Sequence, residues 1–258
     1  HGRYIEVARS AADVRRIVAT DRIAMVLMLQ SGWIADDLGT LEQYHDWGLR
    51  VIALCHLAPF SWVDSSSAAN ARPGLSDFGR QVVAACNELG LLVDLSHASD
   101  ATCRDALEAT TAPVIATHSK CRALSGSPRD LSDDLLRGIA ATGGVIGILA
   151  AAPRSGTESR EARIRRDQRL RAEYADPFEL ATAKLADAEV WSTKLDLAHI
   201  DHAVELVGID HVGLASHAQS SPQWSEYTRD LMQHGYSAEE TGKILGGNVL
   251  RVLEAVPR

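Results

Sequence analysis

Two histidines, His97 and His118, each follow a short apolar run, 91–95 and 113–117. The residues between these runs, 99–110, have a helical pattern of apolar positions. Two apolar runs around a helix predict a βαβ unit whose strands are parallel and buried. Both histidines would then leave the sheet at the same edge, where α/β proteins place their chemistry. Two imidazoles at that edge could begin a metal site.

The alternative for either histidine is structural, because a polar residue is ordinary where a strand meets a loop. The same pattern recurs at three other runs, which weakens that alternative. The apolar runs 23–29, 51–55 and 211–215 are followed closely by Gln30, His56 and His217. In a parallel barrel all five side chains would converge on one mouth, and core packing gives no reason for such a pattern.

The elements that would position these residues alternate along the whole chain. Six apolar runs typical of buried strands are separated by helical patterns, several of them opened by a capping serine, such as Ser76, and closed by a glycine, such as Gly90. This rhythm predicts an α/β fold, and an eight-stranded (β/α) barrel would need two more strands. We expect one barrel domain over residues 1–258, with a charged helical excursion at about 155–190.

Composition excludes some classes of partner. The net charge is −8 and no basic stripe is interleaved with aromatic residues, which argues against nucleic acid. No apolar run has the length of a membrane span. The cysteines form no CxxC pair, so we expect reduced structural thiols and a cytoplasmic location; they are Cys55, Cys86, Cys103 and Cys121.

Several motifs, read together, resemble one family. They are VDLSH, PVIATHS, SPRDLSDDLLRGIAATGGVIGI, HIDHAVELVGIDHVGLAS and ILGGNVLRVL. Together they resemble the membrane (renal) dipeptidase family, whose members are zinc peptidases on an amidohydrolase-like (β/α)8 barrel. The likeness extends in order over nearly the whole chain. It implies a dipeptide or amino-acid-derived amide as substrate, hydrolysis of a peptide or amide bond, and a possible homodimer.

The resemblance also implies roles for individual residues. His97 and His118 match the two histidines that hold the second zinc of the family. His56 matches a histidine that contacts the substrate and the tetrahedral intermediate. Arg129 matches an arginine that binds the substrate carboxylate, a task that suits a guanidinium fork. The structural alternative for Arg129 is an ion pair with a neighbouring aspartate, such as Asp130.

Three departures from the family pattern change what we expect of the site. The family opens with a strand that bears a His-x-Asp metal pair, and no such motif is found near the start of this sequence. Gln30 stands where the family has a bridging glutamate, and His217 stands where it has an acid/base aspartate. An uncharged amide bridges two cations poorly. We therefore expect one zinc or none rather than two, with Gln30 contacting substrate and His217 as a catalytic residue or a third imidazole ligand.

Three functions remain open. The first is a diverged member of the family that acts on, or binds, a small dipeptide or related amide without ordinary dipeptidase activity. The second is a fully active zinc dipeptidase whose His-x-Asp strand is missing from this sequence. The third is a metal-free, non-catalytic binding or assembly protein on the same barrel.

Overall fold

Six parallel strands form the main sheet of the protein. The structure, a computed structural model, describes residues 3–67, 74–150, 165, 169–170, 172–174, 196–216 and 224–256. The strands are β3 (Leu27–Leu29), β4 (Leu49–Ala53), β5 (Leu92–Asp94), β6 (Ile115–Ser119), β7 (Val145–Leu149) and β8 (Val212–Ala215). Each pairs in parallel with the next along the chain, so the order in the sheet is the order in the sequence. Their carboxyl ends therefore lie at one edge.

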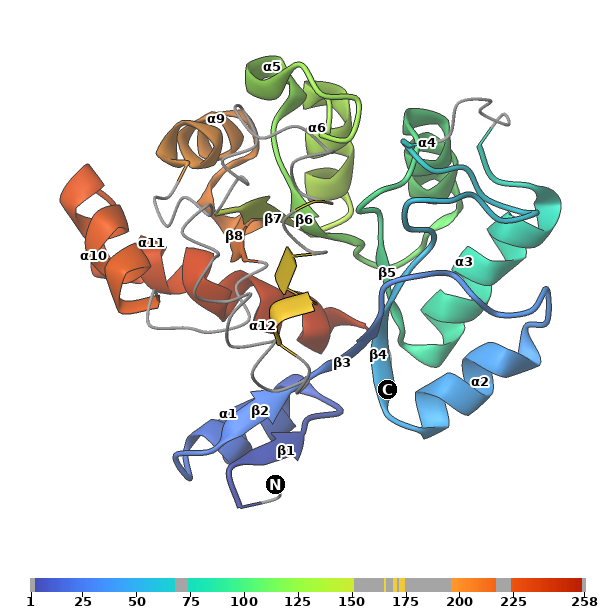
Figure 1. Cartoon of the computed structure of the whole chain (residues 1–258), viewed down its shortest axis with the longest axis horizontal. Helices are drawn as coiled ribbons and strands as arrows, with labels where there is room; N and C mark the ends of the chain where they lie inside the picture. Colours follow the sequence, from blue (N-terminus) through green and yellow to red (C-terminus); the bar gives the residue numbers. More distant parts are fainter. Residues whose placement is uncertain are drawn as a thin grey trace.

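Helices surround these strands on the outside, as in an α/β barrel (Figure 1). They are α2 (Gly39–Asp46), α3 (Asp77–Leu89), α4 (Asp100–Ala109), α6 (Asp133–Ala141) and α9 (Leu197–Val207). None of the described helices is both long and apolar enough to cross a membrane. This arrangement agrees with the (β/α) barrel that we expected, although no strand pairing within the described ranges joins β8 back to the beginning of the chain.

A second, two-stranded parallel sheet precedes the main one. Its strands are β1 (Ile5–Val7) and β2 (Ile23–Met25), connected by helix α1 (Ala11–Val18). Helix α1 is capped by Ser10, whose hydroxyl accepts a hydrogen bond from the Asp13 amide at 3.1 Å. Strand β1 was not among the predicted strands. The predicted strand 23–29 is divided at Val26, on either side of which β2 and β3 join different sheets.

The chain ends in α10 (Trp224–His234), α11 (Ala238–Gly242), a π-helical segment η2 (Lys243–Gly247) and α12 (Asn248–Ala255). The helical path is interrupted at Gly246, whose φ of 146° is one that a residue with a Cβ rarely adopts. Helix α12 packs against a layer of side chains from four neighbouring strands. These are Val51, Leu92, Ile115 and Val145, joined by Val252 of α12. The layer forms an apolar floor below the carboxyl edge of the sheet.

Most predicted helices and strands are confirmed, with one correction that affects the site. Helix α3 is capped by Ser76 and ends at Gly90, whose φ of 71° is left-handed. Strand β6, however, runs through His118 and Ser119 rather than ending before them, because Ser119 pairs with Ile148 of β7 after a shift in register. Nearly all of the excursion predicted at 155–190 lies outside the described residues.

All four cysteines are free and buried, as predicted. Burial raises the pKa of the Cys55 and Cys86 thiols to about 12. A thiol with so high a pKa carries almost no nucleophilic thiolate at neutral pH. The cysteines are therefore packing residues.

Helix α9 is joined to the end of β6 by a buried histidine. The Cys121 amide donates to His199 Nδ1 at 3.1 Å, and Lys120 Nζ donates to Asp196 Oδ2 at 2.6 Å. Because Nδ1 accepts, the proton of the neutral ring lies on Nε2, which is 3.4 Å from the same aspartate oxygen. Burial lowers the pKa of His199 below its usual value.

This histidine gives a pH dependence to folding stability. A lowered folded-state pKa means that the unfolded chain binds the proton more readily, so stability is lost as the pH falls through about 6.5. We expect His199→Asn, which keeps an acceptor for the Cys121 amide but cannot titrate, to lose less stability than wild type between pH 7.5 and pH 5.5. Urea midpoints at both pH values measure the difference. Equal losses in the two proteins would contradict the assignment.

Candidate functional site

The structure brings together five of the predicted site residues at the carboxyl edge of β3 to β6. The Nε2 atoms of His97 and His118 are 3.0 Å apart, and Gln30 Nε2 lies 3.5 Å from His118 Nε2. The His56 ring meets the His97 ring at a centroid distance of 4.4 Å, edge to face. Arg129 donates to the backbone carbonyl of His118 at 2.7 Å. The predicted juxtaposition is thus present in the structure.

His97 is held in a strained conformation. Its φ is 70°, in the left-handed region that a residue with a Cβ adopts only at a cost of about 1–3 kcal/mol. Its carbonyl accepts from the Ser66 amide at 2.7 Å, and the Ser65 hydroxyl lies 3.3 Å from the same oxygen. Ser65 also donates to the His56 carbonyl at 2.6 Å. The loop after β4 therefore fixes the backbones of both histidines, and the strain at His97 is a feature that functional sites often show.

A relay of hydrogen bonds, from the buried Asp94 carboxylate through the Thr117 hydroxyl, determines which ring nitrogen of His118 carries the proton. Asp94, which is 0% exposed, accepts from the Thr117 hydroxyl at 2.6 Å and from the amides of Thr117 and Ser96, each at 2.9 Å. The Thr117 hydroxyl lies 2.8 Å from His118 Nδ1. Since its one proton is given to Asp94, the hydroxyl accepts from Nδ1–H. His118 Nε2 is then unprotonated and faces the site with its lone pair.

Arg129 is a partly buried cation beside the histidines. Its guanidinium donates to Ser119 Oγ at 2.9 Å and to the His118 carbonyl at 2.7 Å. Within the described part of the chain, no carboxylate forms an ion pair with it, so the ion pair with Asp130 that we weighed as its structural alternative is not formed. Burial lowers its pKa, although an arginine stays protonated at any physiological pH. A half-buried guanidinium that pairs with no carboxylate of the described residues, and that has further N–H donors, is suited to bind an anion.

The described residues fit one zinc ion better than two. Two imidazole nitrogens bound to one tetrahedral zinc at about 2.0–2.1 Å lie about 3.3 Å apart, close to the 3.0 Å between His97 Nε2 and His118 Nε2. The lone pair that the relay leaves on His118 is what a metal ligand requires. In the ranges that the structure covers, however, no group of three or more His, Cys, Asp or Glu side chains is arranged to hold a metal. The family's usual pair of ions therefore lacks a ligand set among these residues.

The sequence predicted the histidines and the arginine of the site but not the residues that hydrogen-bond to them and hold them in place. Asp94 and Thr117 were read only as parts of strands, although an aspartate inside an otherwise apolar run was a signal for a buried polar contact. His217 lies outside the described residues, so its predicted role as a catalytic residue or third ligand stays a prediction.

Comparisons with known proteins bear on the family and the fold of the chain. A family model described as membrane dipeptidase (peptidase family M19) matches residues 2–258. Dipeptidase aclJ of Aspergillus oryzae is 30% identical over 264 residues, which cover 97% of this chain and 56% of that protein. The chain thus spans little more than half the length of this relative.

Two solved structures share the fold over most of this chain. The probable dipeptidase PvdM from Pseudomonas aeruginosa has a TM-score of 0.80 and 27% identity, covering 98% of this chain and 74% of that one. A metallopeptidase from Rhodobacter sphaeroides, liganded with a phosphinate mimic of the dipeptide L-Ala-D-Ala, has a TM-score of 0.76 and 25% identity. The match covers 98% of this chain and 69% of that one.

Proposed function

The chain belongs to the membrane dipeptidase family, peptidase family M19, and from this premise we propose that it is a diverged member that recognises a small dipeptide or amino-acid-derived amide. The observation that carries the proposal is the arrangement of His97, His118 and Gln30. Two imidazoles face each other, and a neutral amide lies beside them at 3.5 Å. By resemblance, that amide replaces the bridging carboxylate of the family.

We propose that His97 and His118 hold one zinc ion at most. A bound zinc would supply Lewis-acid polarisation of the scissile carbonyl and a water of lowered pKa. The residues of the chain itself would bind and orient the substrate. Arg129 would take the substrate carboxylate in its guanidinium fork, and His56 and Gln30 would contact the amide to be recognised. The unprotonated Nε2 of His118 and the relay behind it support the metal role.

A test of this function uses L-Ala-D-Ala, the dipeptide whose mimic is bound to the Rhodobacter sphaeroides relative. We expect calorimetry to show binding to the zinc-supplemented protein, and amino-acid analysis to show release of alanine no faster than with His97→Ala/His118→Ala. No binding at all would contradict the proposal. The double variant is the matched control, because both imidazoles are removed while Arg129 stays.

A second candidate is an ordinary zinc dipeptidase. It is favoured by the names of the relatives, such as Dipeptidase aclJ. Robust hydrolysis of L-Ala-D-Ala by wild type, lost in the double variant, would establish this candidate instead.

Location and assembly are further proposals. A reducing compartment such as the cytoplasm is supported by the four cysteines, which are free and buried. A homodimer is supported by four exposed apolar side chains at paired positions of β1 and β2, namely Ile5, Val7, Ile23 and Met25. Light scattering after size-exclusion chromatography measures the mass that decides this point.

A further inference from the structure

Arg122 lies outside the group of residues that face the histidines, yet its guanidinium contacts the two residues on either side of Arg129. After β6 the chain makes an excursion through α5 (Arg122–Ser125) and returns to Leu131. The excursion is closed at its base, where the Arg122 amide donates to the Leu131 carbonyl at 2.8 Å and the Leu131 amide donates to the Lys120 carbonyl at 3.0 Å.

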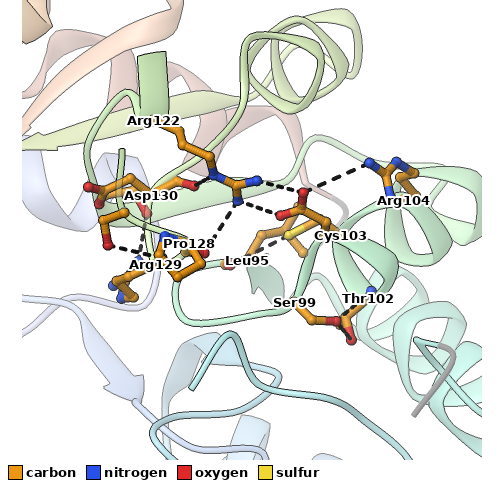
Figure 2. Close-up of polar contacts among 12 residues, drawn as sticks. Leu95, Ser99, Thr102, Cys103, Arg104, Arg122, Pro128, Arg129 and Asp130 are labelled. Carbon is orange, nitrogen blue, oxygen red and sulfur yellow. Dashed lines mark hydrogen bonds and ion pairs between the residues drawn. The ribbon is translucent and has the colours of Figure 1, made fainter. Parts of the chain in front are cut away.

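The Arg122 guanidinium lies beside Pro128 and Asp130 of this excursion (Figure 2). Its Nε donates to the Asp130 carbonyl at 2.8 Å, and one terminal nitrogen lies 3.3 Å from the Pro128 carbonyl. These are the carbonyls of the two residues that flank Arg129. One side chain thus fixes the backbone on both sides of Arg129 and, with it, the direction in which the Arg129 side chain leaves the chain.

The same guanidinium is anchored to the other wall of the site. Its two terminal nitrogens donate to the two carboxylate oxygens of Asp100 at 2.7 and 2.5 Å. Asp100 is the first residue of α4 and follows His97 by only three positions. Hydrogen bonding to Arg122 holds the pKa of Asp100 below its usual range, so the pair is charged at neutral pH. Bidentate pairs of this kind fix geometry as well as charge.

We propose that Arg122, anchored by Asp100, is a positioning residue that sets the place of Arg129 relative to His97 and His118. The proposal rests on the proposed function, in which Arg129 binds the substrate carboxylate. It goes further by assigning specificity for a free carboxylate to a side chain that does not itself touch the substrate. Arg122 is the link between the β5 wall of the site, which carries His97, and the segment after β6.

To test this role, the affinities of wild type and Arg122→Ala are measured for two ligands, L-Ala-D-Ala and its C-terminal amide. Wild type is expected to bind the free acid more tightly, and Arg122→Ala to lose about tenfold of that preference, because a misplacement of about 1 Å can cost up to about a hundredfold. Zinc affinity should stay unchanged in this variant, since Arg122 does not contact His97 or His118. A merely destabilising substitution would not alter the ratio between two ligands.

The matched control is Arg104→Ala. Arg104 is also drawn to Asp100, at 3.9 Å, but the structure shows no contact between it and the segment around Arg129. This variant should keep the preference. Hydrogen exchange of the amides of residues 126–131 gives a readout that needs no ligand, and we expect faster exchange in Arg122→Ala alone.

The outcomes separate the two proposals. A wild-type protein that binds acid and amide equally would overturn the carboxylate role of Arg129 and the proposed function with it. A wild-type preference that Arg122→Ala retains, with unchanged exchange at 126–131, would overturn the positioning role and leave the proposed function standing. A lost preference with faster exchange supports both.

Discussion

Replacing both His97 and His118 by alanine is expected to abolish zinc binding, and wild type is expected to bind about one zinc per chain. The reason is that the Nε2 atoms of His97 and His118 are 3.0 Å apart, and two imidazoles at about this spacing are the start of one tetrahedral shell. Elemental analysis of protein purified in the presence of zinc and then dialysed measures the stoichiometry.

A milder substitution tests the hydrogen bonds behind His118 rather than the metal ligands themselves. Thr117→Val keeps the shape of the side chain but removes the hydroxyl that joins His118 Nδ1 to Asp94. Loss of such a support to a ligand typically weakens metal binding by about 10–100-fold. Ser119→Ala is the matched control, since Ser119 lies on the same strand but its hydroxyl contacts Arg129 instead. Competition with a zinc-binding dye measures the affinities.

Three results would contradict this account. About two zinc ions per wild-type chain would mean that further ligands exist outside the described residues and would favour the ordinary dipeptidase. Zinc retained by His97→Ala/His118→Ala would show that the ion binds elsewhere. An effect of Ser119→Ala as large as that of Thr117→Val would remove the case for the relay.

The parts of the site that sequence could predict are those that depend on position along the chain. A residue that follows a parallel strand must lie at the carboxyl edge of the sheet, so periodicity alone was enough to group His56, His97 and His118. Capping residues such as Ser76 and Gly90 follow equally local rules. These predictions are confirmed because backbone geometry decides them.

The rest depends on contacts between distant segments, which no local pattern encodes. Arg122 lies in a short helix whose sequence resembles any exposed turn, and only folding brings Asp100 to it from α4. The relay likewise joins β5 to β6 through one hydroxyl, Thr117. The extension of β6 through His118 was missed because it depends on a register shift against β7 rather than on the composition of the strand.

The second large effect is expected at Arg129. Replacement by alanine removes the cation that would pair with the substrate carboxylate, and a hydrogen bond to a charged group contributes about 1.5–3 kcal/mol. We therefore expect Arg129→Ala to bind L-Ala-D-Ala about 10–100-fold more weakly while its C-terminal amide binds as it does to wild type. Calorimetry with both ligands measures the effect.

Arg129→Lys separates charge from shape. Lysine keeps the positive charge but presents a single ammonium, which cannot donate at once to the Ser119 hydroxyl, the His118 carbonyl and both oxygens of a ligand carboxylate. We expect this variant to recover only a small part of the lost affinity. Full recovery would show that a point charge is sufficient, and an equal loss for acid and amide in Arg129→Ala would show that Arg129 supports the fold of the segment rather than the carboxylate. Arg129 is held on one side by its own hydrogen bonds to β6, and we propose that Arg122 holds the backbone on its other side. Lysine can reproduce the charge but not the planar fork that these contacts orient, and this is why we expect it to recover so little of the affinity.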